Sequence, residues 1–314
     1  MPVLRNIHKL LDREIRAKNV VAFRYWLKGM HWQLKRPKMP DPVFIVGCSR
    51  SGTTVIYETV RQSKSLLSFG YELPRLWNGL WGPAHNGWAS EAASAEDART
   101  EHRDAAFKFF YERLGSGRVL DKTCINTMRI PYLNKLFPNA HFIYIYRDGR
   151  DNVSSLMEGW KIGEHFALEK FLGAFPCSVR IENGSFNQWC FFLPPGWRDY
   201  NEASLDEVCA HQWITANQMA LDAKKLVPER QWIQMRYEDL FFRPVEVFED
   251  VFERLGLPFD EHIRNRCANL KAHPTSIVKG QPQLGKWKKQ NPQAIGRIIE
   301  KIRPLMNELG YDAN

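Results

Sequence analysis

The sequence predicts an α/β fold in which helices flank a parallel β-sheet. Five short apolar runs have the composition of strands that are buried on both faces. Stretches in which apolar residues recur at helical spacing separate these runs, and such alternation is typical of parallel sheets. Ligands of these sheets bind at the carboxyl ends of the strands. The runs lie at 43–46, 65–69, 118–123, 141–146 and 232–237.

The loop after the first run predicts an anion site. A small, polar stretch from Gly47 to Gly52 leads into a helical pattern that begins at Thr53. Strand, tight loop and helix together aim backbone N–H groups and a helix dipole at one point. The glycine spacing is that of a nucleotide P-loop, but the usual lysine is absent and Arg50 lies inside the loop. We expect a P-loop-like site for one phosphate, the alternative being a tight turn without a ligand. Its residues would be Ser49, Arg50, Ser51, Gly52, Thr53 and Thr54.

Helices are expected between the strands. Ser204 to Glu207 have the sequence of a capping box, which predicts a helix that runs to about Leu226. Asn291 and Pro292 begin a C-terminal helix, in which Pro304 should cause a kink or a break. Other helices should follow the Gly47–Thr54 loop and Arg150, and cover 95–114, 131–137 and 245–255.

Two segments interrupt this rhythm. Residues 77–94 hold three tryptophans and several glycines, which predicts a functional loop or a wall for the acceptor. Residues 160–203 are rich in aromatic residues and contain Pro194-Pro195-Gly196. We interpret this second segment as an insertion that serves as both lid and wall of the active site.

Charge separates an N-terminal arm from the body. The chain has 314 residues and a net charge of +9, and residues 1–40 alone hold ten basic and two acidic residues. The arm is predicted to form one or two basic amphipathic helices, which either pack on the body or contact an anionic membrane or a polyanion. The nearly neutral remainder, 41–314, is predicted to be a single domain, and no nucleic-acid partner is expected.

Cysteine use and hydropathy bear on location. The six cysteines are scattered without a Cys-x-x-Cys pair, which favours a reducing compartment, although one Cys177–Cys190 bridge stays open. No apolar run is long enough to cross a bilayer, and Arg24 interrupts the only run that resembles a signal-peptide core. We therefore expect a cytoplasmic or membrane-peripheral protein.

A second anion site is predicted after the run at 141–146. Arg147 and Ser155 lie eight residues apart across a strand, a turn and a helix. This spacing places a guanidinium and a hydroxyl on the same side of the neighbouring crevice, where they can bind a phosphate. Two anion sites on neighbouring strands suit a nucleotide with separate 3′ and 5′ phosphates.

The two motifs together resemble those of the sulfotransferases that use 3′-phosphoadenosine-5′-phosphosulfate (PAPS). Their wording is most similar to that of the tyrosylprotein sulfotransferases and their bacterial relatives. The resemblance implies that the Gly47–Thr54 loop holds the 5′-phosphosulfate and that Arg147 and Ser155 hold the 3′-phosphate. It also implies that Tyr237 and Lys286 contact the nucleotide.

The same resemblance suggests catalytic residues. Glu72 resembles the general base of the tyrosylprotein group, and Lys122 resembles the cation that faces the transferring sulfonate; Arg50 would hold the leaving phosphate. The alternatives are an ion pair between Glu72 and Arg75, and a surface position for Lys122. Many sulfotransferases use histidine as the base, so His85 and His102 are reserve candidates. The resemblance also suggests a part for Ser276 in the transfer, but the spacing around it differs from that of the family.

The expected function is transfer of a sulfonyl group from PAPS to an acceptor hydroxyl by in-line displacement, without a metal, which leaves 3′-phosphoadenosine-5′-phosphate (PAP). A saccharide, a lipid-linked glycan or a small metabolite is favoured over peptide tyrosine. The first alternative is a P-loop nucleotide-dependent kinase, which would need the absent loop lysine. The second is a non-catalytic protein that binds a polyanion or a membrane through its basic arm.

Overall fold

A five-stranded parallel sheet forms the centre of the computed structural model, which describes residues 2–270 and 283–312, with side chains from residue 18 onward. The strand order is β2-β3-β1-β4-β5, so the first strand lies in the middle of the sheet. Each neighbouring pair is parallel, and all carboxyl ends therefore meet at one edge. The predicted fold class is confirmed. The strands are β1 (Val43–Val46), β2 (Leu66–Ser68), β3 (Arg118–Lys122), β4 (His141–Tyr146) and β5 (Trp232–Arg236).

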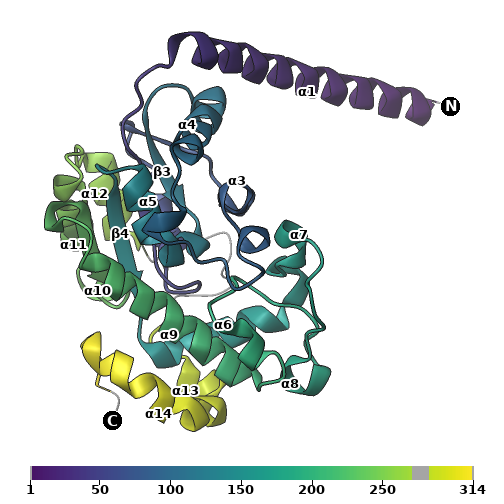
Figure 1. Cartoon of the computed structure of the whole chain (residues 1–314). Helices are drawn as coiled ribbons and strands as arrows, with labels where there is room; N and C mark the ends of the chain where they lie inside the picture. The colour runs from purple at the N-terminus through teal and green to yellow at the C-terminus, as the bar shows by residue number, and fades with distance from the viewer. Residues whose placement is uncertain (1, 271–282, 313–314) are drawn as a thin grey trace.

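Helices cover both faces of the sheet (Figure 1). Side chains alternate along each strand, so Val43 and Ile45 of β1 pack in one core cluster and Phe44 and Val46 in the other. The smaller cluster takes side chains from α2 (Thr53–Val60), α11 (Pro244–Arg254) and α12 (Glu261–Ala268). The larger cluster takes side chains from α4 (Thr100–Leu114), α5 (Ile130–Leu136), α6 (Gly149–Lys161), α9 (Leu205–Lys224) and α14 (Pro292–Glu308).

Local sequence signals explain several helix ends, with one exception. The Ser204 hydroxyl lies 2.9 Å from the Glu207 carboxylate, so the capping box that begins α9 is confirmed. A kink or a break was expected at Pro304; α14 continues through it to Glu308, so the break is wrong. Because Ile302 and Leu305 are buried in the core, packing holds this last turn in place. The structure also contains α12, a helix that the sequence analysis did not predict.

The segment that begins at residue 77 differs from its prediction. Residues 74–80 form the helix α3 (Pro74–Leu80) with proline in its first turn, where the missing N–H costs nothing. Trp77 is fully buried and its indole N–H donates to Asp121 Oδ2 at 2.7 Å. Trp77 is thus a core residue and is not part of an exposed acceptor wall. A 3-10 turn follows at Pro83–His85.

The aromatic segment 160–203 is tied firmly to the body. It contains the short helices α7 (Glu169–Leu172) and α8 (Ile181–Gly184) and 3-10 turns at Gly163–His165 and Trp197–Tyr200. Several of its rings are anchors in the larger core cluster, while Phe166 is only half-buried and Phe171 is exposed. The fully buried rings are Trp160, Trp189, Phe192 and Trp197.

The N-terminal arm is one long helix, α1 (Pro2–Lys35). Figure 1 shows it projecting beside the body, which it meets near α4 at its C-terminal end. Trp32 is buried there, and its ring centroid lies 5.6 Å from that of Tyr111. Packing on the body thus holds for the last turns of α1 and leaves residues 18–24 exposed.

The described residues contain neither a membrane-spanning helix nor a disulfide bond. None of their helices is both long enough and apolar enough to span a bilayer. All six cysteines are free, so the Cys177–Cys190 bridge is not formed.

Candidate functional site

The loop between β1 and α2 has a fixed, unusual backbone. Arg50 and Gly52 have positive φ angles of 70° and 105°. The Thr127 hydroxyl accepts the Gly47 N–H at 2.7 Å and donates to the Gly47 carbonyl at 2.9 Å. The Ser51 hydroxyl is buried and has no hydrogen-bond partner in the described part of the chain. Because a buried hydroxyl normally has a partner, this one suits an oxygen of a bound phosphate.

The fold of this loop requires a glycine at position 52, and this requirement can be tested. A Cβ at this position would lie 2.4 Å from Cδ2 of the Tyr237 ring, and the φ of 105° disfavours any other residue. We expect Gly52→Ala to reduce affinity for PAP at least tenfold, roughly 1.4 kcal/mol or more, because ring and loop must separate. Calorimetry measures this loss. Gly256→Ala is the matched control, since its φ is 66° and no atom lies within 4 Å of the added Cβ; equal losses in both variants would contradict the steric account.

Lys122 and Glu72 form an ion pair beside the loop. Lys122 Nζ lies 2.6 Å from Glu72 Oε1 and 3.5 Å from Thr54 Oγ1. The Cys124 N–H donates to the other Glu72 oxygen at 3.0 Å. Lys122, at the end of β3, thus brings a cation to the loop, whose own sequence lacks the P-loop lysine.

The environment of this pair decides between the alternatives. The Lys122 side chain is only 7% exposed and the Glu72 side chain 34%, so Lys122 is no surface residue. Burial lowers the pKa of Lys122, but its neighbours, with the Glu72 carboxylate foremost, together raise it above its ordinary value, so the ammonium form is favoured. The alternative of a Glu72–Arg75 pair is not formed, because Glu72 pairs with Lys122 while Arg75 donates to the Lys170 carbonyl at 3.4 Å.

Cys124 was not singled out by the sequence, although it contacts Glu72 and Thr53. Burial, with the Glu72 carboxylate, raises the pKa of its thiol to about 11. The thiol therefore stays protonated at neutral pH and is a weak nucleophile.

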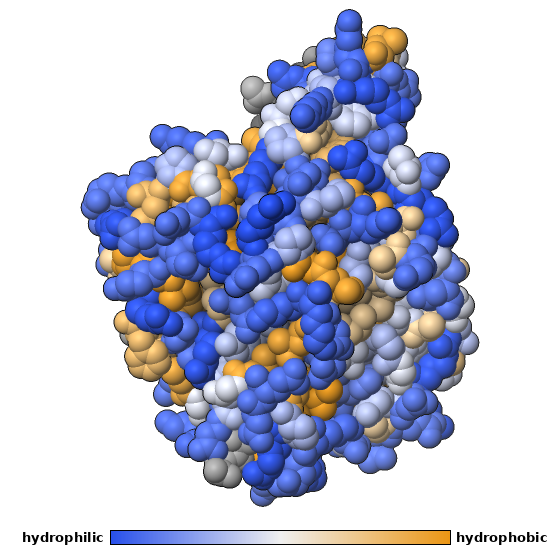
Figure 2. Space-filling model, turned by 60° about the vertical axis from the view of Figure 1, so that its left-hand side comes forward, coloured by the Kyte–Doolittle hydropathy of each residue, from blue (hydrophilic) through white to orange (hydrophobic). Residues whose placement is uncertain are grey.

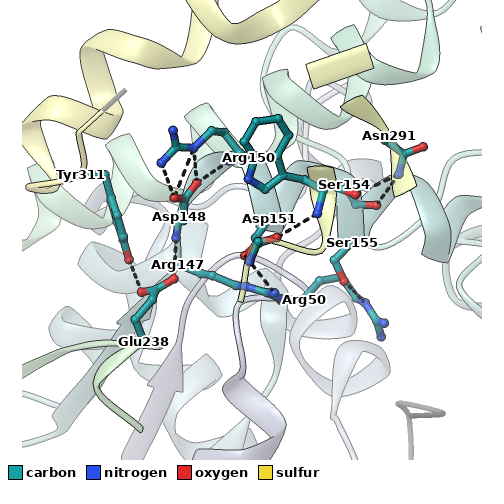
Figure 3. A network of polar contacts seen from close by, with 12 residues as sticks. Arg50, Arg147, Asp148, Arg150, Asp151, Ser154, Ser155, Glu238, Asn291 and Tyr311 are labelled. Carbon is teal, nitrogen blue, oxygen red and sulfur yellow. Dashed lines mark hydrogen bonds and ion pairs between the residues drawn. The ribbon is translucent and has the colours of Figure 1, made fainter. Parts of the chain in front are cut away.

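The second predicted cluster forms beside the first. Arg147 Nη1 donates to the Arg50 carbonyl at 3.2 Å, and Arg50 Nε donates to the Ser155 hydroxyl at 3.3 Å (Figure 3). The Arg147 guanidinium lies 4.5 Å from the centroid of the Tyr237 ring. Burial and the Arg147 charge lower the pKa of Arg50, which shows two cations facing each other. An anion between them would relieve that repulsion.

Asp151 fixes the C-terminal side of this cluster, and the sequence analysis did not identify it. Its carboxylate accepts the Gly285 N–H at 2.7 Å and the Trp287 N–H at 3.2 Å, and Arg147 Nη2 lies 3.8 Å away. Lys286 lies between the two anchored residues, just before α13 (Trp287–Gln290), and is thus brought to the Arg147 cluster. An acid in the turn after Arg147 was the available signal, but nothing local indicated a partner 134 residues away.

A further network positions the turn that carries Arg147. The Asp148 N–H donates to Glu238 Oε1 at 3.1 Å, and the Tyr311 hydroxyl donates to Glu238 Oε2 at 2.6 Å (Figure 3). Glu238 directly follows Tyr237 after β5, in the short connection before α10 (Asp239–Phe242). The C-terminal segment therefore helps to hold Arg147 and Tyr237 together.

The reserve histidines have other partners. His85 is exposed, accepts the Gly82 N–H at Nδ1 and stacks on Trp81. The His102 ring nitrogen lies 3.0 Å from the Tyr132 hydroxyl, and burial lowers its pKa. Ser276 lies outside the described residues. Within 2–270 and 283–312, no three His, Cys, Asp or Glu side chains gather as a metal site would require.

Comparison with known proteins places this site in context. A family model described as "Sulfotransferase family" matches residues 42–175 and 179–261, which include both clusters up to Tyr237 and most of the 160–203 segment. Protein-tyrosine sulfotransferase A of Caenorhabditis elegans is 23% identical over 293 residues, covering 87% of this chain and 67% of the relative.

Two further matches are more distant. Carbohydrate sulfotransferase 1 of Mus musculus is 24% identical over 204 residues, which cover 62% of this chain and 41% of the relative. The chain thus spans about two thirds of one curated relative and less than half of the other. The crystal structure of sulfotransferase STF9 from Mycobacterium avium covers 91% of this chain and 82% of its own, with a TM-score of 0.57. At 13% identity, this likeness shows the fold alone.

Proposed function

Because this chain belongs to the sulfotransferase family, we propose that it transfers a sulfonyl group from PAPS to an acceptor hydroxyl and releases PAP. The observation that carries the proposal is the pair of adjacent anion-binding clusters, which Arg50 joins. One is the Gly47–Thr54 loop, and the other is built on Arg147 and Ser155. A donor with phosphates at both ends of one ribose would occupy both.

The polar groups of the site fit such a donor. In the loop, the Ser51 hydroxyl would bind the 5′-phosphate together with the Thr53 and Thr54 hydroxyls and the N–H groups that begin α2. In the second cluster, the buried Arg147 Nε lacks a partner among the described residues and would help bind the 3′-phosphate. Ser155 and Lys286 would complete this contact, and Tyr237 would pack against the nucleotide.

The chemistry requires few groups from the protein. The acceptor oxygen forms a bond to sulfur as the bond from sulfur to the 5′-phosphate oxygen breaks, and the acceptor proton passes to the Glu72 carboxylate. Glu72 is a third exposed, so it is open to an acceptor, and Lys122 Nζ lies 2.6 Å from its Oε1. Lys122 and Arg50 would stabilise the charge that develops on the sulfonate and on the leaving phosphate.

The acceptor we propose is a saccharide, a lipid-linked glycan or a small metabolite in preference to peptide tyrosine. Products formed from PAPS and a panel of these compounds, with a tyrosine peptide included, test this choice by mass spectrometry. We expect one class of hydroxyl to gain a sulfonate and PAP to form in equal amount, also in the presence of a chelator. Sulfonation of the tyrosine peptide alone would contradict the proposed acceptor.

The N-terminal arm is proposed to make peripheral contact with an anionic partner, either a membrane or a polyanion. Residues 18–38 of the arm contain six basic residues and no acidic residue. We propose peripheral contact on this basis, a cytoplasmic location on the basis of the six free cysteines, and no nucleic-acid partner.

Arg147→Ala tests the second cluster. The variant loses a charge-assisted contact to the 3′-phosphate, so affinity for PAP should fall by about 1.5–3 kcal/mol, roughly tenfold or more. Adenosine 5′-phosphate, which lacks the 3′-phosphate, is the matched control ligand and should bind both proteins alike. Calorimetry with both nucleotides measures the difference; equal losses for the two would mean that Arg147 holds the loop and not the 3′-phosphate.

A further inference from the structure

From Lys18 onward, where the side chains of α1 are described, one face of this helix is packed against the body. Gly29 and Trp32 lie on that face: a Cβ on Gly29 would come within 2.6 Å of Glu112 Oε1 in α4, and Trp32 is 5% exposed. The Tyr25 ring lies 5.2 Å from the Arg113 guanidinium of α4. These contacts fix the rotation of the helix about its axis.

The opposite face presents an apolar stripe to solvent. Apart from the adjacent pair Trp26 and Leu27, its residues follow one another at intervals of three and four, which aligns them along one side of a helix. Their exposed fractions range from 42% at Met30 to 77% at Leu34. In Figure 2, α1 is the projection at the top of the molecule, where hydrophobic and hydrophilic residues lie side by side. The stripe consists of Val20, Phe23, Trp26, Leu27, Met30 and Leu34.

The charges beside the stripe select its partner. Between Lys18 and Lys38 the chain has six basic residues and no acidic residue, and of the six Arg36 pairs with Asp104 of α4 at 3.0 Å. A second copy of α1 laid along the stripe would bring cations against cations, which disfavours a dimer. A soluble polyanion would use the cations and leave the apolar stripe in water. A surface with both anionic groups and an apolar interior satisfies both features.

We propose that the stripe of α1 binds the surface of a bilayer that contains anionic lipids. The apolar side chains enter the boundary between headgroups and acyl chains, and the flanking basic residues contact lipid phosphates and carboxylates. Trp26, whose ring is both apolar and a hydrogen-bond donor, suits that boundary. This inference deepens the proposed peripheral contact of the arm by naming its partner.

Vesicle binding by the full chain tests the proposal. Co-sedimentation is measured with vesicles of phosphatidylcholine alone and of phosphatidylcholine mixed with phosphatidylserine, and heparin serves as the soluble polyanion. The test variant is Phe23→Ser with Leu27→Ser, both in the stripe. The matched control is Leu226→Ser with Phe242→Ser, which are 63% and 75% exposed elsewhere on the body.

We expect the stripe variant to bind the mixed vesicles at least about tenfold more weakly than the unchanged protein and the control do, because two apolar contacts are lost. The unchanged protein, the stripe variant and the control variant should bind heparin with the same affinity, and all three should bind vesicles of pure phosphatidylcholine only weakly. Unchanged vesicle binding by the stripe variant, binding to heparin alone, or a dimer that the stripe variant abolishes would each overturn the proposal. PAP affinity is measured in the same samples. Absence of PAP binding would count against the proposed enzyme activity, whereas the vesicle result alone decides the membrane contact.

Discussion

Glu72→Gln is expected to lower turnover by roughly 10²–10⁴, because glutamine keeps the size of the side chain and cannot take the acceptor proton. The carboxylate contacts Lys122 and the Cys124 N–H at the carboxyl edge of the sheet, so it is fixed in place before an acceptor arrives. Initial rates with an acceptor identified by mass spectrometry measure the effect.

The same variant should bind PAP with nearly unchanged affinity, since the residues proposed to hold the phosphates are others. Glu101→Gln, an exposed position on α4, is the matched control and should turn over normally. Near-normal turnover by Glu72→Gln would show that another group is the base, and His85 and His102 would then be substituted.

Lys122→Met is expected to lower kcat by roughly 10²–10³, because a methionine fills the same space and supplies no charge to the developing sulfonate or phosphate. Nucleotide affinity should fall much less, since the effect belongs to the transition state. The Glu72 carboxylate is 34% exposed and can be solvated when its partner is removed, so the variant should fold.

Lys108→Met, a half-exposed lysine on α4, is the matched control for the loss of one positive charge. Thermal unfolding of both variants separates a folding defect from a catalytic one. A rise in KM as large as the fall in kcat, or no change in either, would contradict the proposal that Lys122 stabilises the transition state.

Much of the sheet could be predicted because its strands are short apolar runs that end in polar residues. The run at 141–146 became β4 with the same bounds, and the sites predicted after β1 and β4 did come together. Register and strand order were beyond reach, since they depend on contacts between segments far apart in the chain.

The failures have local causes. α3 was missed because Trp77, Gly79 and Trp81 read as a loop, although Trp77 is a core residue whose burial holds the helix. The Glu72–Lys122 pair joins residues that are 50 positions apart in the sequence. Arg75 is closer to Glu72 in the sequence, but it contacts the Lys170 carbonyl instead. The anchoring of Gly285 and Trp287 by Asp151 could not be seen either, because no periodicity connects them.

The central claim is that two adjacent clusters hold the 5′ and 3′ phosphates of one nucleotide. Calorimetric titration of the unchanged protein with PAP in the presence of a chelator tests it without knowledge of the acceptor. We expect one PAP to bind per chain, about tenfold or more tighter than adenosine 5′-phosphate, because the Arg147 cluster adds a charge-assisted contact. Binding that requires magnesium and prefers ATP over PAP would contradict the claim and favour a kinase.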